Sequence, residues 1–337
     1  MLCNYLPLLC TLWLPVAVFA HPTAEKMHRK AANSSISVYM DVPGPPNLEN
    51  LVVRRNGEIL VTSYASPSIY RITPNTAEAP IAVAQIPNAT ALTGIMELQE
   101  NVFIIAAADP LSPGSNAVWR LDMRPEESNN GSAHAPAQLS LLARIPFAQV
   151  LNGMTRLAKN DTSHVLISDS AAGNVIRLNV VTGDYAVVIS DPTMLPISDG
   201  INVGVNGIHT WGDQLFYISL DQGIFAKIPI SLSTGAAKGP ADIIINGTLE
   251  FPDDFALSRD GLTAWVAENG VFVLMEVDIL AKTSRVKFNN TLLASTSSAA
   301  LGRSCSNWDS IYITGAKLGA NGTAVQGRVF EAKLDTL

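Results

Sequence analysis

An internal repeat constrains this chain more than any other feature of its sequence. Each copy has a polar anchor residue, an alternating apolar strand, a short turn and a strongly apolar strand that ends in a small or acidic residue. The copies read ENLVVRRNGEILVTS at 49–63, GIMELQENVFIIAAAD at 94–109, NGMTRLAKNDTSHVLISD at 152–169, NGIHTWGDQLFYIS at 206–219, DDFALSRDGLTAWVAE at 253–268 and SAALGRSCSNWDSIYITG at 298–315. Their spacing of about 45–58 residues is typical of propeller blades. We therefore predict an all-β fold, a six-bladed β-propeller.

The turns inside the repeat support antiparallel hairpins. Asn56-Gly57, Gly212-Asp213 and Asp260-Gly261 stand between the paired strands, and Gly and Asn tolerate the positive φ of tight turns. Third strands are predicted at SIYRITP (68–74), AVWRLDM (117–123), NVIRLNV (174–180), GIFAKIPI (223–230) and RVFEAKLD (328–335). No apolar pattern with a period of 3.6 residues is sustained, so we expect few helices.

The amino-terminal segment is typical of a secretory signal. Residues 1–20 are apolar and uncharged and end in Val18-Phe19-Ala20, a pattern that favours cleavage before His21. An amino-terminal membrane anchor is the alternative, because no Lys or Arg precedes the apolar run. Residues 21–35 are expected to form a flexible lead-in, and 36–337 a single propeller domain with no further membrane span.

Seven N-glycosylation sequons also favour passage through a secretory pathway, although a turn can hide a sequon from modification. Their asparagines are Asn33, Asn88, Asn130, Asn160, Asn246, Asn289 and Asn321. Cleavage of the signal would remove Cys3 and Cys10, so the mature chain would keep only Cys305 and form no internal disulfide. We interpret Cys305 as a small buried hydrophobe, with a nucleophile as the alternative.

The charge of the chain argues against nucleic-acid binding. The formal net charge is −7 with an isoelectric point near 5.2, and no run of Lys or Arg is long enough to follow a phosphate backbone. Nothing in the sequence fixes the oligomeric state.

The anchor positions indicate where a site would lie. The innermost strand of each blade starts near the propeller axis, so Glu49, Asn152, Asn206 and Asp253 are expected to converge there. Carboxylate and amide oxygens suit a hard cation such as Ca²⁺. The alternative is that Asn-Gly marks only a turn, as it does elsewhere in this chain.

The repeat and its anchors resemble the gluconolactonase and regucalcin superfamily of six-bladed propellers, over most of residues 36–337. That resemblance implies a catalytic calcium held by Glu49 in ENLVV, Asn152 in NGMTR, Asn206 in NGIH and Asp253 in PDDFALS. Asp254 replaces the Gly that usually follows and is expected as a further ligand. The phrases ENLVVRRNGEILVTS and SSAALGR…IYITG look more like a fungal secreted branch that includes the hetero-Diels-Alderases of tropolonic sesquiterpenoid biosynthesis.

The resemblance and the apolar composition favour a pericyclase that joins a tropolone quinone methide to a humulene-type alkene. Such an enzyme works by proximity and by a hydrogen bond to the quinone methide oxygen, and it requires no cofactor. The polar candidates are Asn152, Asn206, His209 and Arg303, and Asp253 is a candidate acid or base for expelling water from a hydroxymethyl precursor. The candidate apolar walls are Tyr64, Met154, Phe255 and Trp265.

Two other functions fit the same pocket. In a calcium-dependent lactonase or esterase, the metal would polarise the carbonyl and Asp253 or His209 would act as base. A non-enzymatic ligand-binding propeller would use the anchors only structurally. Strand alternation places His209 on the opposite face from Asn206, so a histidine packed between blades is the alternative reading of that residue.

Overall fold

The fold of the chain was obtained as a computed structural model that describes residues 36–76, 78–124 and 136–334. The predicted signal peptide (1–20), the predicted lead-in (21–35) and the sequon residues Asn33 and Asn130 lie outside the described residues. Within them, 24 strands form six four-stranded sheets, and a short 3₁₀ helix, η1, spans Pro192–Met194. The described residues contain no helix that is long and apolar enough to cross a membrane.

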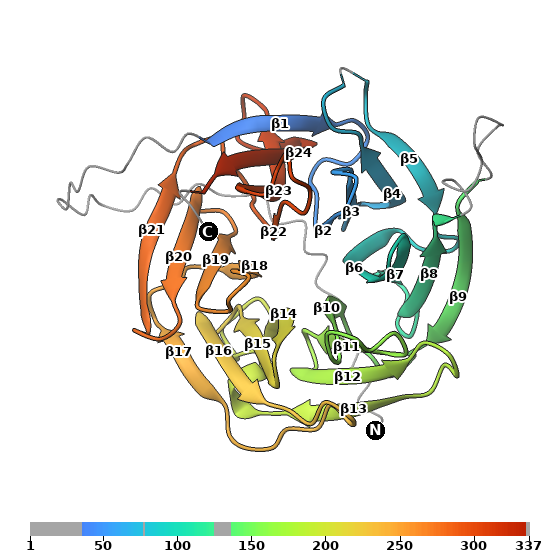
Figure 1. The fold of residues 1–337 in the computed structure, drawn as a ribbon, viewed down its shortest axis with the longest axis vertical. Coiled ribbons are helices and arrows are strands. Elements are labelled where there is room, and N and C mark those ends of the chain that lie inside the picture. Colours follow the sequence, from blue (N-terminus) through green and yellow to red (C-terminus); the bar gives the residue numbers. More distant parts are fainter. Residues whose placement is uncertain (1–35, 77, 125–135, 335–337) are drawn as a thin grey trace, which may run out of the picture.

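The six sheets are the blades of a propeller (Figure 1). The first blade consists of β2 (Leu51–Val53), β3 (Ile59–Ser63), β4 (Ser66–Ile72) and β5 (Ile81–Gln85). The second consists of β6 (Ala91–Gln99), β7 (Val102–Ala108), β8 (Ala117–Asp122) and β9 (Gln138–Arg144). The third consists of β10 (Leu151–Arg156), β11 (His164–Asp169), β12 (Asn174–Asn179) and β13 (Tyr185–Ser190).

The remaining blades repeat this order from the axis outward. The fourth consists of β14 (Val205–Trp211), β15 (Gln214–Ser219), β16 (Ile224–Pro229) and β17 (Asp242–Asn246). The fifth consists of β18 (Pro252–Leu257), β19 (Thr263–Glu268), β20 (Val273–Asp278) and β21 (Thr283–Asn289). The sixth consists of β22 (Ala299–Leu301), β23 (Ser310–Leu318), β24 (Ala324–Lys333) and β1 (Ile36–Val42).

The sixth blade closes the ring by taking its outermost strand from the other end of the chain. β1 pairs antiparallel with β24, from Ile36 opposite Ala332 to Val42 opposite Gly327. Arg328 of β24 donates hydrogen bonds to both carboxylate oxygens of Asp41 on β1. Ring closure therefore joins the first and last described strands in one sheet.

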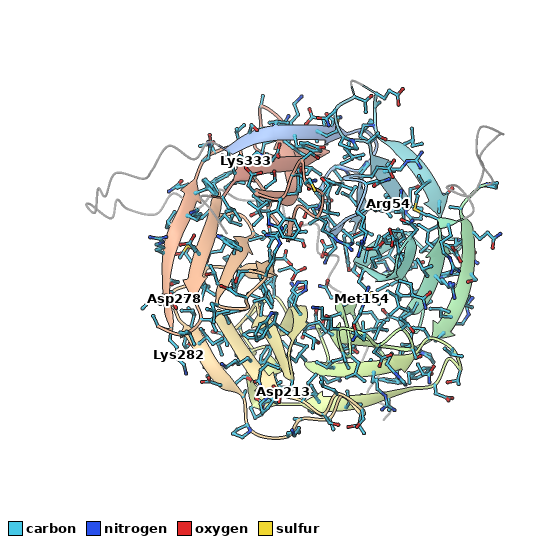
Figure 2. The ribbon with its side chains drawn as sticks, in the orientation of Figure 1. Arg54, Met154, Asp213, Asp278, Lys282 and Lys333 are labelled. Carbon is cyan, nitrogen blue, oxygen red and sulfur yellow. The ribbon has the colours of Figure 1, made fainter. Side chains whose placement is uncertain are left out.

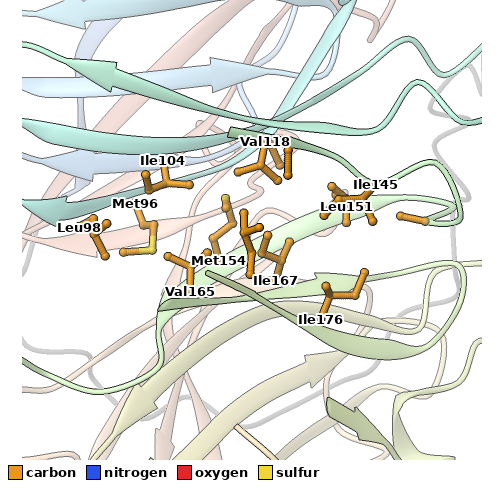
Figure 3. Close-up of a cluster of buried hydrophobic side chains, with 14 residues drawn as sticks. Met96, Leu98, Ile104, Val118, Ile145, Leu151, Met154, Val165, Ile167 and Ile176 are labelled. Atoms are coloured by element: carbon orange, nitrogen blue, oxygen red, sulfur yellow. The ribbon is translucent and has the colours of Figure 1, made fainter. Parts of the chain in front are cut away.

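Six apolar clusters fill the spaces between neighbouring blades. Figure 3 shows one of them, in which Met96 and Ile104 of the second blade pack against Met154 and Ile167 of the third. The second strands are covered on both faces, so every residue of β3 is buried, whereas the outermost strand β5 has no buried residue. Burial at about 25 cal/mol per Å² of apolar surface is the main force that holds the blades together.

The predicted fold is confirmed, and the predicted inner hairpins coincide with the first two strands of each blade. Gly212 has a φ of 61° and opens the two-residue loop between Trp211 and Gln214, as the turn chemistry predicts. The outermost strands are not predicted by the sequence pattern, because their short, half-exposed segments alternate only weakly between apolar and polar residues.

Candidate functional site

A pocket of about 1200 Å³ opens at one end of the propeller axis. Its walls are the carboxyl-terminal halves of the innermost strands and the loops that follow them, including Arg55, Lys159, Trp211, Arg259 and Trp308. The mouth therefore lies on the face where the first and second strands of each blade are joined. Figure 2 places Met154, a wall residue, close to the centre of the ring.

Asp254 organises the polar floor of this pocket. Its Oδ1 lies 3.0 Å from Nε2 of His209 and accepts a 2.8 Å hydrogen bond from the backbone N–H of Phe255. Its Oδ2 lies 3.0 Å from Oγ of Ser298, which is also 3.0 Å from Oδ1 of Asn50. Asn50, His209 and Ser298 line the pocket, so the carboxylate behind them fixes the groups that a ligand would meet.

A glycine in the neighbouring blade makes room for this carboxylate. A Cβ atom added to Gly207 would lie 2.0 Å from Oδ1 of Asp254. In the same way, Cβ atoms on Gly94 and Gly153 would lie 2.1 Å and 2.4 Å from the carbonyl oxygens of Asn152 and Asn206. The fifth blade carries Asp254 where these blades carry glycine, and its side chain fills the space beside Gly207.

A β-bulge lies in the strand segment between Asn206 and His209. The pairing of β14 with β15 shifts register between Val205 and Ile208, so strict alternation does not hold between Asn206 and His209. The His209 ring packs edge-on against Phe255, with centroids 4.7 Å apart, and it also lines the pocket. His209 is thus both a packed side chain and a pocket residue.

The anchors lie beyond the pocket floor, near the starts of the innermost strands. Oδ1 of Asp253 accepts a 2.7 Å hydrogen bond from Nδ2 of Asn206, and Oδ2 accepts a 3.1 Å bond from Nδ2 of Asn269. Burial raises the pKa of Asp253 to about 7, with a further contribution from the charge of Asp254, while the two amide hydrogen bonds oppose the shift. Burial together with the charges of Asp253 and Asp254 raises the pKa of Glu49 well above its ordinary value. The three carboxylates therefore form one electrostatic cluster.

The donor types of this cluster suit calcium, but their arrangement does not form a ligand cage. Both oxygens of Asp253 and both oxygens of Asp254 accept hydrogen bonds from protein donors. Oδ1 of Asn152 is buried without a partner, so it is one anchor oxygen left for another group. No group of three or more His, Cys, Asp or Glu side chains within the described residues is placed to hold a metal ion.

Two arginines and one glutamate form the wall nearest the second and third blades. Arg303 is ion-paired with Glu97 and donates a 3.0 Å hydrogen bond from Nη1 to the carbonyl of Val53. Arg156 donates from Nε and Nη2 to the carbonyl oxygen of Glu97 and from Nη1 to that of Lys159. Burial and the nearby charge of Arg303 lower the pKa of Arg156, and Glu97 opposes that shift.

Only some of the predicted site residues line the pocket, and the others lie beyond its floor, in the core or on the opposite face. Met154, His209 and Arg303 line the pocket, whereas Asn152, Asn206 and Asp253 are not among its lining residues. Phe255 is fully buried behind His209, and Trp265 packs in the core between the fifth and sixth blades. Tyr64 follows β3 and therefore lies on the opposite face from the mouth.

Cys305 differs from its predicted environment. It is exposed in the loop between β22 and β23 and lines the pocket mouth, because this hairpin ends in a polar loop instead of a tight turn.

Several pocket residues were missed by the sequence analysis. Asn50 follows the predicted anchor Glu49 directly, and Ser298 begins the sixth repeat. The repeat pattern could therefore have predicted both as axial residues. Arg156, Arg259, Trp211 and Trp308 belong to strand ends and loops in four different blades, and no spacing in the sequence associates them.

Comparison with known proteins gives one curated relative in sequence and many in fold. No family model matches the chain. The chain is 27% identical over 268 residues to a Sarocladium schorii protein named "Putative hetero-Diels-Alderase asR5", and the match spans 67% of this chain and 66% of that protein, slightly under two thirds of its length.

Solved propellers share the fold at low sequence identity. A luciferin-regenerating enzyme matches with a TM-score of 0.62 and 13% identity over 89% of this chain and 95% of its own. The calcium-binding protein regucalcin of Agrobacterium tumefaciens matches with a TM-score of 0.58 and 14% identity over 88% of this chain and 96% of its own. A virginiamycin B lyase of Staphylococcus aureus matches with a TM-score of 0.54 and 14% identity over 86% of this chain and 80% of its own. These likenesses show the fold alone.

Proposed function

We propose that this six-bladed propeller, which resembles a hetero-Diels-Alderase in sequence and regucalcin in fold, is a pericyclase of the hetero-Diels-Alderase type. Its substrates would be a tropolone-derived quinone methide and a humulene-type alkene. The observation that carries the proposal is the axial pocket, which is large, partly apolar and has hydrogen-bonding groups on its floor.

The size of the pocket suits two reactants. Pockets for one drug-sized ligand usually measure about 300–1000 Å³, and this one measures about 1200 Å³. Leu51, Ile95, Met96 and Met154 supply apolar surface for a hydrocarbon partner. Holding diene and dienophile in reactive contact can correspond to effective molarities of about 10⁵ M or more, so that no covalent catalyst is required.

The floor can stabilise the oxygen of the quinone methide. Nδ2 of Asn50 makes no hydrogen bond to another described residue, and the ring nitrogen of His209 that faces away from Asp254 is also without one. When it is protonated, the His209 ring donates from Nε2 to Asp254, and its second N–H can donate to a developing oxyanion. Asp254 thereby positions His209, and Asn50 adds a second donor.

The same imidazolium can generate the quinone methide from a hydroxymethyl precursor. The leaving hydroxyl takes a proton and departs as water, while the ring hydroxyl of the precursor loses a proton, so the net change is loss of one water molecule. The cycloaddition then forms two bonds between the reactants and releases no atom. His209 takes over the acid role that the sequence analysis gave to Asp253, because His209 lines the pocket.

The direct test incubates the purified protein with the hydroxymethyl tropolone precursor and humulene, with and without a chelator. We expect a stereochemically uniform adduct at a rate well above the uncatalysed one, unchanged by the chelator. Simple lactones are assayed in parallel. Chelator-sensitive lactone hydrolysis without adduct formation would instead establish the calcium-dependent hydrolase, and the absence of both activities would favour a binding protein.

We further propose that the chain passes through a secretory pathway and carries glycans. The five described sequon asparagines are all exposed, as glycosylation requires: Asn88, Asn160, Asn246, Asn289 and Asn321. Expression in a eukaryotic host should give secreted protein whose mass falls after treatment with an N-glycosidase. Retention of unmodified protein inside the cell would contradict this proposal.

A further inference from the structure

The pocket has the opposite charge to the protein as a whole. The chain has a formal net charge of −7. Among the residues that line the pocket, however, only Glu97 is acidic, and five are basic: Arg55, Arg156, Lys159, Arg259 and Arg303. Charges of one sign that converge on a concave surface concentrate ligands of the opposite sign.

The wall of Arg156 and Arg303 has donors left for a ligand. Arg156 directs three N–H groups to backbone carbonyl oxygens, makes no ion pair within the described residues, and retains one N–H on Nη1 and one on Nη2. Arg303 uses only Nη1 for Glu97 and Val53. One carboxylate thus faces two guanidinium groups, and the wall keeps a net positive charge.

Two tryptophan rings, those of Trp211 and Trp308, lie at the mouth of the same pocket. The guanidinium carbon of Arg259 lies 3.6 Å from the ring centroid of Trp308, and Nε1 of Trp211 donates to the carbonyl of Arg259. Trp211 is 44% exposed and Trp308 52% exposed, so both indole rings remain available to stack on a planar ligand.

We propose that Arg156 and Arg303 form an anion-binding subsite, and that the pocket takes a planar conjugated organic anion whose charged oxygens face this wall. The planar guanidinium fork suits a pair of neighbouring oxygens, as in a tropolonate or a carboxylate. The acidic residues Glu49, Asp253 and Asp254 lie beyond the floor and are not lining residues, so the positive charge of the pocket is concentrated at this wall and orients the charged end of the anion toward the arginines. The inference rests on the proposed function for its pocket, and it adds the ionisation state and orientation of one substrate.

Calorimetric titration of the purified protein tests this subsite without turnover. The probes are tropolone under conditions where it is ionised, its O-methyl ether, which cannot ionise, and acetate, which has no ring. We expect ionised tropolone to bind at least about tenfold more tightly than either of the others. If the ether binds as tightly as ionised tropolone, the ligand need not be an anion and the proposal is wrong. If acetate binds as tightly as ionised tropolone, the ligand need not be planar and conjugated, which also contradicts the proposal.

Two variants on the wall have opposite expected effects. Arg156→Gln should weaken tropolone binding about tenfold or more, because a charge-assisted hydrogen bond is lost. Glu97→Gln should strengthen it, because Arg303 loses its counter-charge. Arg177→Gln is the matched control, since Arg177 is half-buried on β12, is not a pocket residue and, like Arg156, donates to a backbone carbonyl, that of Thr234.

The outcomes separate this inference from the proposed function. Unchanged binding in Arg156→Gln, or weaker binding in Glu97→Gln, would overturn the subsite even if the protein forms the adduct. Selective binding of ionised tropolone that depends on Arg156, without adduct formation, would support the subsite and count against the pericyclase.

Discussion

Single residues at the pocket floor depend on one another through Asp254. Its carboxylate contacts His209 and Ser298, and Ser298 in turn contacts Asn50. These groups come from the first, fourth, fifth and sixth blades or their edges. Because these contacts hold Asn50 and His209 in place, their two donors that face the pocket need little reorganisation when a ligand binds.

Replacing His209 tests this arrangement. His209→Gln keeps an amide that can donate to Asp254 but removes the imidazolium. We expect adduct formation to slow about 10- to 100-fold, because one donor to developing negative charge is lost. The rate is measured under saturating substrates, with the melting temperature as control. An unchanged rate at unchanged stability would remove His209 from the mechanism.

Glu268 gives a prediction for stability against pH. Glu268 is buried, accepts a 3.0 Å hydrogen bond from the backbone of Glu250, and burial raises its pKa from 4.5 to about 7. The folded state thus binds the proton more tightly than the unfolded state, so stability falls as the pH rises from about 4.5 to 7.

Glu268→Gln should remove this loss, which we estimate at about 2 to 3 kcal/mol. Chemical denaturation of the wild type and the variant at several pH values measures the difference. Glu100→Gln, at an exposed glutamate, serves as control. Parallel pH profiles for the wild type and Glu268→Gln would contradict the prediction.

At the scale of strands, bulges and glycines set how closely the blades approach the axis. β6, β10, β14 and β18 each shift register after their first or second residue. Side-chain hydroxyls then link neighbouring blades: Thr62 donates to the carbonyl of Thr93 at 2.6 Å, and Thr93 to that of Leu151 at 2.7 Å. The second blade thus uses Thr93 where the third and fourth use Asn152 and Asn206.

Gly207→Ala tests this close approach. The added Cβ would meet Oδ1 of Asp254 at 2.0 Å, so Asp254 must move or the strands must separate. We expect a loss of about 1–3 kcal/mol in the free energy of unfolding, together with weaker ligand binding. Gly239→Ala makes the same chemical change against only the side chain of Pro229, at 3.3 Å, and should have a much smaller effect. Equal effects of the two substitutions would contradict the crowding argument.

At the scale of the whole molecule, the stability of the ring depends on its closure by β1. Val42 on this strand is fully buried, whereas Val38 on the same strand is 40% exposed. Val42→Ala should therefore cost about 2 kcal/mol and Val38→Ala much less. Thermal or denaturant unfolding of the two variants measures this contrast. Similar losses would mean that the closing strand contributes little through its buried face.

The sequence by itself determined the number of blades and their inner hairpins, and it predicted that Glu49, Asn152, Asn206 and Asp253 converge near the axis. Those features follow from local alternation and from a repeat that keeps its phase, which a linear pattern records. Only the tertiary structure decided which mouth is open, that His209 lines it after a bulge in β14, and that Asp254 fills the space beside Gly207.

The wall of Arg156 and Arg303, and the position of Trp211 and Trp308 at the pocket mouth, also could not be predicted from the sequence. Arg156 and Arg303 are far apart in the sequence and meet only because the ring closes, so that Arg303 of the sixth blade reaches Val53 of the first blade and Glu97 of the second. Contacts between blades depend on how closely the backbones approach each other, and no periodicity within one blade encodes that distance.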